Sequence, residues 1–149
     1  MPIKKIPLIF GVPPKSFYAR ISEKKAFVAE LRPGLEGMQI VAGELLKNHI
    51  RPVIICDNML AFCMKQGLVK EAHIFCEGLS KRSGLCRTGS LIAALCAKAH
   101  HVPVFLHQGR VAGRKPSSLL KMAGMKVTST DIKTYVPFFE EVPLTLVKG

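Results

Sequence analysis

Short apolar runs alternate with longer, more polar stretches along most of the chain. The apolar runs occupy residues 7–10, 26–31, 52–56, 72–76 and 102–107. Most of their positions are apolar without a polar residue between them, which indicates strands that are buried on both faces. Stretches of helical character, at residues 15–24, 35–49, 57–67 and 90–101, separate these runs. This alternation is typical of a parallel sheet between two layers of helices. We therefore predict an α/β fold with a mostly parallel sheet and helices on both of its faces.

The last part of the chain continues this pattern less clearly. Residues 116–124 predict a short helix that closes at Gly124, and residues 125–129 and 143–147 predict two final strands.

The size and composition of the chain indicate a folded protein. A length of 149 residues suits one domain, and 48% apolar residues argue against disorder. No apolar run is long enough to cross a bilayer, and the first residues do not form a signal peptide. We expect a single domain over residues 1–149 in the cytoplasm, without a membrane partner.

The cysteines favour a reduced protein. Their number is odd and no two of them form a CxxC pair. Free cysteine packs as a small apolar side chain, so we expect buried, reduced thiols. The residues concerned are Cys56, Cys63, Cys76, Cys86 and Cys96.

The chain is strongly basic, with a formal net charge of +12. Such a surface attracts phosphate groups, whether on nucleic acid, nucleotides or sugar phosphates. The cations are spread along the chain, without a basic tail or aromatic residues between them. A nucleic-acid role and a merely solvated basic surface both remain open.

Polar residues follow three of the predicted strands. They are Arg32, which precedes Pro33, then the pair Asp57 and Asn58, and finally the segment 77–90. Ligands of such sheets bind beyond the carboxyl ends of the strands. We expect these segments to meet at one edge.

The end of segment 77–90 is similar to a phosphate-binding loop. Residues 84–90 nearly fit the pattern GxxxxGK[ST], but the lysine is missing, which excludes the ATPase interpretation. The backbone N–H groups of a helix start could still hold an anion, aided by Arg87, Thr88, Gly89 and Ser90. The alternative is an ordinary helix cap without a ligand.

The other polar residues each allow two interpretations. Glu77 is a general acid or forms an ion pair with a neighbouring cation. Asp57 and Asn58 contact a sugar hydroxyl or cap a helix, and Arg32 binds phosphate or braces a loop. The histidines show no HxxxH or HExxH spacing, so we expect no metal site.

Four segments carry an ordered set of family motifs. They are FVAELRPGLEGMQIVAGEL, VIICDNMLAFCMKQGLVKEAHIFCEG, LCRTGSLIAALCAKAHHVPVFLH and VPFFEEVPLTLV. Together they resemble the C-terminal domain of the initiation factor 2B-like superfamily, from about Leu8 onward. That superfamily holds regulatory subunits of translation initiation factor 2B, methylthioribose-1-phosphate isomerase and ribose-1,5-bisphosphate isomerase. We expect the family's N-terminal helical domain to be absent.

The resemblance implies a Rossmann-like three-layer α/β/α domain with a mostly parallel sheet, which is usually dimeric and has a sugar-phosphate pocket at the strand ends. The family's isomerases use an aspartate, whose position is taken by Glu77, and an NKIGT loop, in which Cys86 and Arg87 replace Asn-Lys. They also use a cysteine on the first strand, where this chain has Phe10 and Gly11.

These observations lead to three functional hypotheses. The first is a stand-alone, non-catalytic domain that binds a phosphorylated metabolite without a cofactor and forms a homodimer or pairs with a related subunit. The second is an aldose–ketose isomerase of a sugar 1-phosphate, with Glu77 as the catalytic acid/base. The third is a nucleic-acid or protein interaction module linked to translation. The ligand-binding residues of the first hypothesis are Arg32, Asp57, Asn58, Gly78, Arg87, Thr88, Gly89 and Ser90.

Overall fold

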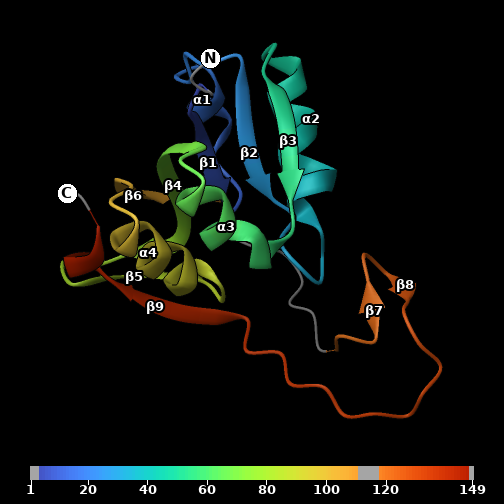
Figure 1. Cartoon of the computed structure of the whole chain (residues 1–149). Coiled ribbons are helices and arrows are strands. Elements are labelled where there is room, and N and C mark those ends of the chain that lie inside the picture. The colour runs from blue at the N-terminus through green and yellow to red at the C-terminus, as the bar shows by residue number, and fades with distance from the viewer. Residues whose placement is uncertain (1–3, 111–117, 148–149) are drawn as a thin grey trace.

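The computed structural model describes residues 4–110 and 118–147 (Figure 1). The strands of the main sheet are β1 (Ile6–Phe10), β2 (Lys25–Ala29), β3 (Arg51–Ile55), β4 (Val69–Leu79), β5 (Ser83–Arg87), β6 (Val104–Gln108) and β9 (Phe139–Pro143). The helices are α1 (Lys15–Tyr18), α2 (Ala42–Lys47), α3 (Leu60–Lys65) and α4 (Ser90–Ala99). A π-helical turn (Gly37–Val41) leads into α2, and a 3-10 turn (Asp57–Met59) leads into α3.

The main sheet has seven strands and is mixed but mostly parallel. Its strand order is β3-β2-β1-β4-β5-β9, and β6 pairs with β4. The β1–β2, β2–β3, β1–β4 and β4–β6 pairs are parallel, whereas β5 is antiparallel to both β4 and β9. This confirms the predicted fold class.

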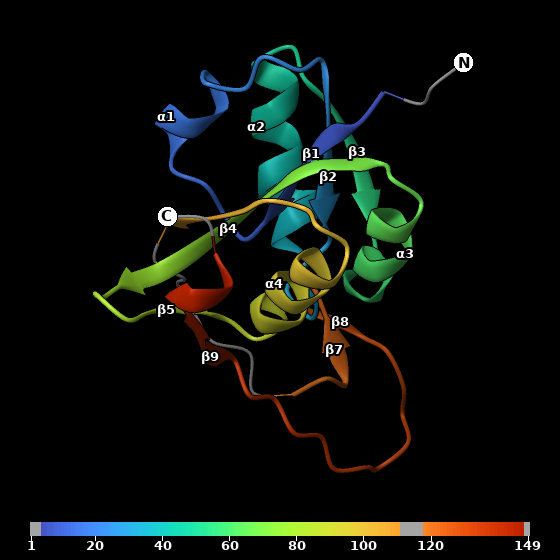
Figure 2. The same cartoon turned by 60° about the vertical axis from the view of Figure 1, so that its left-hand side comes forward.

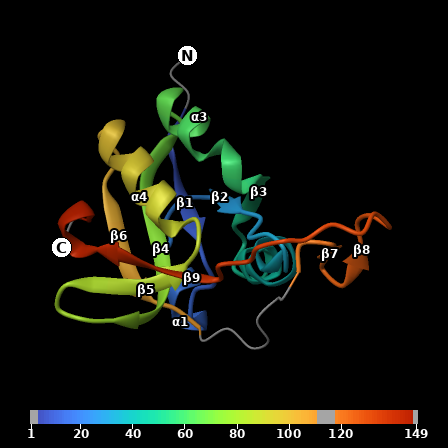
Figure 3. The ribbon, with the colours of Figure 1, turned by 90° about the horizontal axis from the view of Figure 1, so that it is seen from below.

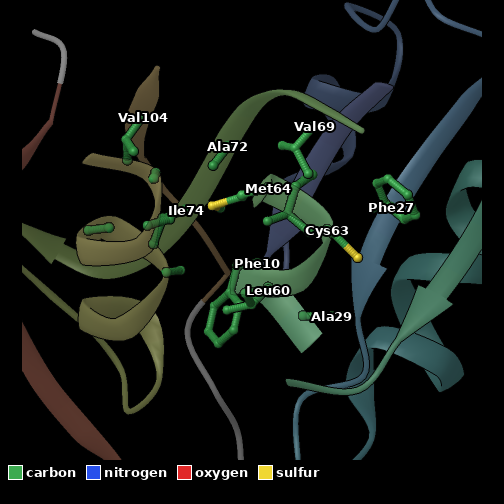
Figure 4. Packing of buried hydrophobic residues seen from close by; sticks show 14 of the residues in the cluster. Phe10, Phe27, Ala29, Leu60, Cys63, Met64, Val69, Ala72, Ile74 and Val104 are labelled. Carbon is green, nitrogen blue, oxygen red and sulfur yellow. The ribbon is translucent and has the colours of Figure 1, made fainter. Parts of the chain in front are cut away.

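Helices cover both faces of the sheet, as Figure 2 shows. Along β1, Leu8 and Phe10 belong to one buried cluster, with α3 and α4, whereas Ile9 belongs to the other, with α1 and α2. Figure 4 shows the first cluster, to which β1, β2, α3, β4 and β6 all contribute side chains. Burial on both faces explains why these strands are apolar at successive positions.

The later elements differ from their predictions. Residues 118–124 form no helix: β7 (Lys121–Met122) and β8 (Met125–Lys126) make a small separate hairpin. Residues 116 and 117 lie outside the described residues. The predicted strand at 143–147 is wrong: β9 ends at Pro143, which has no N–H to donate, and Leu144–Leu146 form a 3-10 turn. The predicted helix at 15–24 ends at Tyr18, after which only isolated turns follow.

The expected loop between β4 and α4 is a β-hairpin. Strand β4 continues to Leu79 and turns back as β5, so that Cys76 and Cys86 face each other in the antiparallel ladder. Their Cα atoms are 4.2 Å apart and their sulfurs form a disulfide. The prediction of reduced thiols was therefore wrong for these two residues, because the cross-strand pairing could not be seen from their spacing. Cys56, Cys63 and Cys96 are free.

Among the residues that the structure describes, no helix combines the length and the apolar character needed to cross a bilayer.

Candidate functional site

A pocket of about 210 Å³ lies beyond the carboxyl ends of the parallel strands. Its walls come from the loop after β2, from the end of β5, and from the long segment that precedes β9. Seen from below in Figure 3, this segment runs from the β7–β8 hairpin across the molecule to β9. The described residues that line the pocket are Arg32, Pro33, Arg87, Thr88, Leu119, Tyr135, Val136, Pro137 and Phe138.

Arg32 is held in this pocket by a buried carboxylate. Its Nε donates to Glu30 Oε1 at 2.7 Å, and the Glu30 side chain is only 5% exposed, whereas that of Arg32 is 54% exposed. The contact with Glu30 raises the pKa of Arg32, so this guanidinium stays charged. A guanidinium has five N–H donors, so one ion pair leaves donors for an anionic ligand.

Arg87 is the second guanidinium of the pocket, and it is packed more tightly. Its Nη1 lies 2.8 Å from Glu36 Oε2, and its guanidinium stacks on the ring of Phe138, 4.8 Å from the centroid. The side chain is 9% exposed. The ion pair and the ring together hold Arg87 in a fixed orientation beside Thr88.

Asp57 uses its carboxylate on the protein's own backbone. Its two oxygens accept hydrogen bonds from the N–H groups of Leu31 and Arg32, at 2.9 and 2.8 Å. Burial raises the pKa of Asp57, against the opposing effect of these two hydrogen bonds. Asp57 therefore ties the loop after β2 to the end of β3 and so positions Arg32. Its neighbour Asn58 is exposed, and neither residue lines the pocket.

The start of α4 already holds an anion of this chain. Glu140 Oε1, from β9, accepts hydrogen bonds from the N–H groups of Gly89 and Leu91 at 2.9 and 2.8 Å. The N–H of Thr88 donates to the carbonyl of Phe138. Two of the backbone donors predicted for an external anion are thus engaged, whereas the Thr88 side chain is exposed.

Gly89 and Ser90 have structural roles in this arrangement. Gly89 has φ +109°, and a Cβ there would lie 2.9 Å from the ring of Phe10. Only glycine fits both requirements. Ser90 is fully buried and does not line the pocket.

The structure separates Glu77 and Gly78 from the two arginines. Glu77 lies at a register shift of β4, is half-buried, and its carbonyl accepts a hydrogen bond from Gln108 Nε2 at 2.6 Å. Gly78 lines a different depression, with Ser80 and Ser83 of the hairpin. Of the predicted ligand residues, the pocket thus brings together Arg32, Arg87 and Thr88.

Sequence reasoning missed the carboxylates that organise this site. Glu30 and Glu36 flank Arg32 closely in the chain, and this acid–base neighbourhood could have indicated ion pairs. Glu140 lies 51 residues after Gly89, so no local signal could identify it as the cap.

A polar cluster was also missed on the α1 side of the sheet. His73 Nδ1 lies 2.8 Å from His107 Nε2, and His73 Nε2 lies 3.1 Å from Glu71 Oε1. Burial, with the nearby charges of His73 and Arg20, lowers the pKa of His107 to about 4. Within residues 4–110 and 118–147, no three His, Cys, Asp or Glu side chains are grouped to hold a metal ion.

Comparison with known proteins supports the resemblance seen in the motifs. Residues 16–149 match the model of the family described as "Initiation factor 2 subunit family". A methylthioribose-1-phosphate isomerase from a Nostoc species is 27% identical over 139 residues, covering 83% of this chain and 40% of the relative. The isomerase of Desulfitobacterium hafniense is 26% identical over 138 residues, with the same coverage. The chain thus spans about 40% of the length of these curated relatives.

Solved structures share the fold. Subunit delta of translation initiation factor eIF-2B from A. fulgidus superposes with a TM-score of 0.81 at 18% identity, over 99% of this chain and 51% of that one. The 5-methylthioribose 1-phosphate isomerase of Pyrococcus horikoshii superposes equally well, with a TM-score of 0.81 at 20% identity, over 99% and 49% of the two chains.

Proposed function

The chain belongs to the Initiation factor 2 subunit family, and from this premise we propose that it is a non-catalytic member that binds a phosphorylated metabolite. The ligand is a sugar phosphate or a nucleotide, and it binds in the pocket at the carboxyl ends of the strands.

One observation carries this proposal: two arginines meet in one pocket, and each is oriented by a carboxylate. Glu30 forms an ion pair with Arg32, and Glu36 forms one with Arg87, whose guanidinium also stacks on Phe138. A planar guanidinium that is fixed in orientation loses little freedom when it binds phosphate, and it can form two parallel hydrogen bonds.

The remaining walls suit the rest of such a ligand. Thr88 offers a hydroxyl next to Arg87, and Tyr135 and Val136 offer apolar surface. A sugar or a base could pack on this surface while its phosphate faces the arginines.

The non-catalytic part of the proposal rests on Phe10 and Glu77. The resemblance places Phe10 where the family's isomerases have a cysteine, and Phe10 is 2% exposed, with its side chain in the core. Glu77, in the position of the catalytic aspartate, does not line the pocket that contains the arginines. Aldose–ketose isomerisation needs an acid and a base over adjacent carbons of the substrate.

The test is thermal unfolding in the presence of sugar phosphates and nucleoside monophosphates. We expect at least one of them to raise the midpoint, because a ligand that binds only the native state stabilises it by mass action. Arg32→Ala should abolish the shift, whereas Arg82→Ala, an exposed residue on the β4–β5 turn, should preserve it. The absence of any shift, or a shift that survives Arg32→Ala, contradicts the proposal.

A second candidate is isomerase activity on a sugar 1-phosphate. The observation in its favour is that relatives such as those from Nostoc and Desulfitobacterium hafniense are named methylthioribose-1-phosphate isomerases. If it is correct, the chain converts methylthioribose 1-phosphate, and Glu77→Gln removes the activity. Failure to detect product at high protein concentration counts against it.

Self-association with a second copy or a related subunit is also part of the proposal. Light scattering of the purified chain measures it, and a monomer over the whole accessible concentration range would refute the homodimer.

A further inference from the structure

The edge of the sheet opposite the pocket carries a row of cations. The adjacent parallel strands β3, β2, β1 and β4 each have lysine or arginine at or directly before their start, and all of these side chains are exposed. In Figure 1 this edge lies at the top, beside the N-terminus, because β2 and β3 run downward from it. We define the basic edge as Lys4, Lys5, Lys24, Lys25, Arg51 and Lys70.

The sheet register brings these residues side by side. Lys25 of β2 is the direct partner of Arg51 of β3, and Ile6 of β1, which follows Lys5, is the partner of Val69, which precedes Lys70. Neighbouring strands are about 4.8 Å apart, so the four strand starts form a row about 15 Å long. Residues that are separate in sequence thus become one linear array of charge.

This array is hardly neutralised by acidic side chains. Lys70 pairs with Glu23, at 2.5 Å. No carboxylate among the described residues lies within ion-pair distance of the other five cations.

The cations of the basic edge are not those that offset the helix dipoles either. Lys47, Lys65 and Lys98, in the last turns of α2, α3 and α4, offset the negative ends of the helix dipoles. Strand ends have only small dipoles. Apart from Lys70, the cations at the strand starts therefore have no compensating ion pair among the described residues, which is the condition of a surface that receives a partner's negative charge.

We propose that the basic edge binds the phosphate backbone of a nucleic-acid duplex without sequence preference. A duplex presents phosphates at regular spacing along a line, and the strand starts that carry the cations are regularly spaced too, whereas the carboxylates of an acidic protein are irregular. The lysines act as mobile point charges, which suits backbone contacts and not the reading of bases.

This inference is independent of the proposed metabolite site. The two surfaces lie at opposite ends of the parallel strands, and the basic edge includes neither Arg32 nor Arg87.

The experiment is fluorescence anisotropy of a labelled RNA duplex at a series of salt concentrations. The logarithm of the binding constant should fall linearly with the logarithm of salt concentration, because phosphate contacts release counterions. The double variant Lys25→Glu/Arg51→Glu should weaken binding at low salt by about tenfold or more and lower the slope by about 2, one for each lost phosphate contact. A DNA duplex should behave in the same way, since the contacts are to the backbone.

The matched control is Lys81→Glu/Arg82→Glu, two exposed cations on the β4–β5 turn. It changes the net charge by the same amount but leaves the basic edge intact, so its salt slope should stay close to that of the unmodified chain. Circular dichroism verifies that both variants are folded, and the milder Lys24→Gln/Lys25→Gln provides a second measurement if the first variant fails to fold.

Three results would overturn the proposal. The first is no binding of either duplex at low salt. The second is an equal loss in the test and control variants, which would mean that net charge alone attracts the duplex. The third is equally tight binding of poly-glutamate through Lys25 and Arg51, which would point to an acidic protein as the partner.

Discussion

Glu140 caps α4 from β9, with its Oε1 accepting a hydrogen bond from the N–H of Gly89 at 2.9 Å. The same oxygen accepts from Leu91 at 2.8 Å. The start of α4 therefore attracts an anion, as its glycine-flanked sequence indicates, but a carboxylate of the chain itself takes that position. A phosphate ligand would meet Arg32, Arg87 and the Thr88 side chain beside this cap.

Replacement of Glu140 by alanine should destabilise the protein. Two helix N-terminal donors lose their acceptor and the helix dipole loses a favourable charge, at a cost of about 1–2 kcal/mol in the free energy of unfolding. Urea unfolding measures it, with Glu141→Ala as the control, since Glu141 is exposed and adjacent. Equal stability of the two variants would contradict the cap.

Gly89→Ala should also be destabilising, because φ +109° is strained for alanine and the new Cβ would lie 2.9 Å from Phe10. We expect a loss of about 1–3 kcal/mol. Gly43→Ala gives the contrast: it lies within α2 with nothing within 4 Å of the added methyl, and it should stabilise by about 0.5–1 kcal/mol. Thermal melts of both variants test whether the first substitution lowers the stability and the second raises it.

Asp57 should matter for stability more than its exposed neighbour. Asp57→Ala leaves the N–H groups of Leu31 and Arg32 without their acceptor and should cost about 1–3 kcal/mol. Asn58→Ala should change stability by less than about 0.5 kcal/mol. If both substitutions are silent in denaturant unfolding, the loop after β2 does not depend on Asp57.

The stability of the protein should fall as the pH drops from about 6.5 to about 4. His107 has its pKa lowered to about 4 by burial and by His73 and Arg20, so within this window the unfolded chain takes up a proton that the native state does not. The stabilisation is complete above pH 6.5, and about 1–2 kcal/mol of it is lost by pH 4, allowing for the partial exposure of the ring.

Unfolding of the His107→Phe variant across the same pH range provides the control. This substitution keeps an aromatic ring to stack on Phe75 but removes the titrating group. Its stability should depend less on pH in this window, and an unchanged profile would exclude His107 as the cause.

Stability should fall again at high pH because of Tyr18. Burial, reinforced by the Glu44 carboxylate, raises the pKa of Tyr18 to about 12. The unfolded chain loses the phenol proton at its ordinary pKa of 10, so stability is complete below pH 10 and decreases as the pH rises toward 12.

Ultraviolet absorbance of tyrosinate in a Tyr135→Phe background measures this directly, since Tyr18 is then the only tyrosine in the chain. In the native state the absorbance should rise near pH 12, and in urea near pH 10. Coincident titrations in the two states would show that Tyr18 is not protected.

Most of the fold could be predicted from the sequence, because the patterns that indicate strands and helices lie within short runs of neighbouring residues. Runs such as 52–56 and 72–76 are apolar at successive positions because their strands are buried on both faces, and this pattern is visible before any pairing is known. The hairpin β7–β8 was missed because it depends on a distant contact, in which the N–H of Ala123 donates to the carbonyl of Pro33.

The candidate site was predicted less completely. Arg32, Arg87 and Thr88 come together as expected, because the carboxyl ends of parallel strands meet at one edge. The prediction could not tell that Asp57 and the Gly89 amide are already engaged, or that Cys76 and Cys86 are joined.

The sequence by itself determined the five parallel strands, the order in which they alternate with helices, and the presence of cations and hydroxyls where strands and helices meet. Burial and helix periodicity are properties of neighbouring residues, so they can be read along the chain. Only the tertiary structure decided which carboxylate faces which donor, because Glu140 and Gly89 meet through the pairing of β5 with β9. The same pairing across the sheet gathers Lys25 and Arg51 into one row at the far edge. Charges exert their effect through distance in space, and the register of the sheet sets that distance.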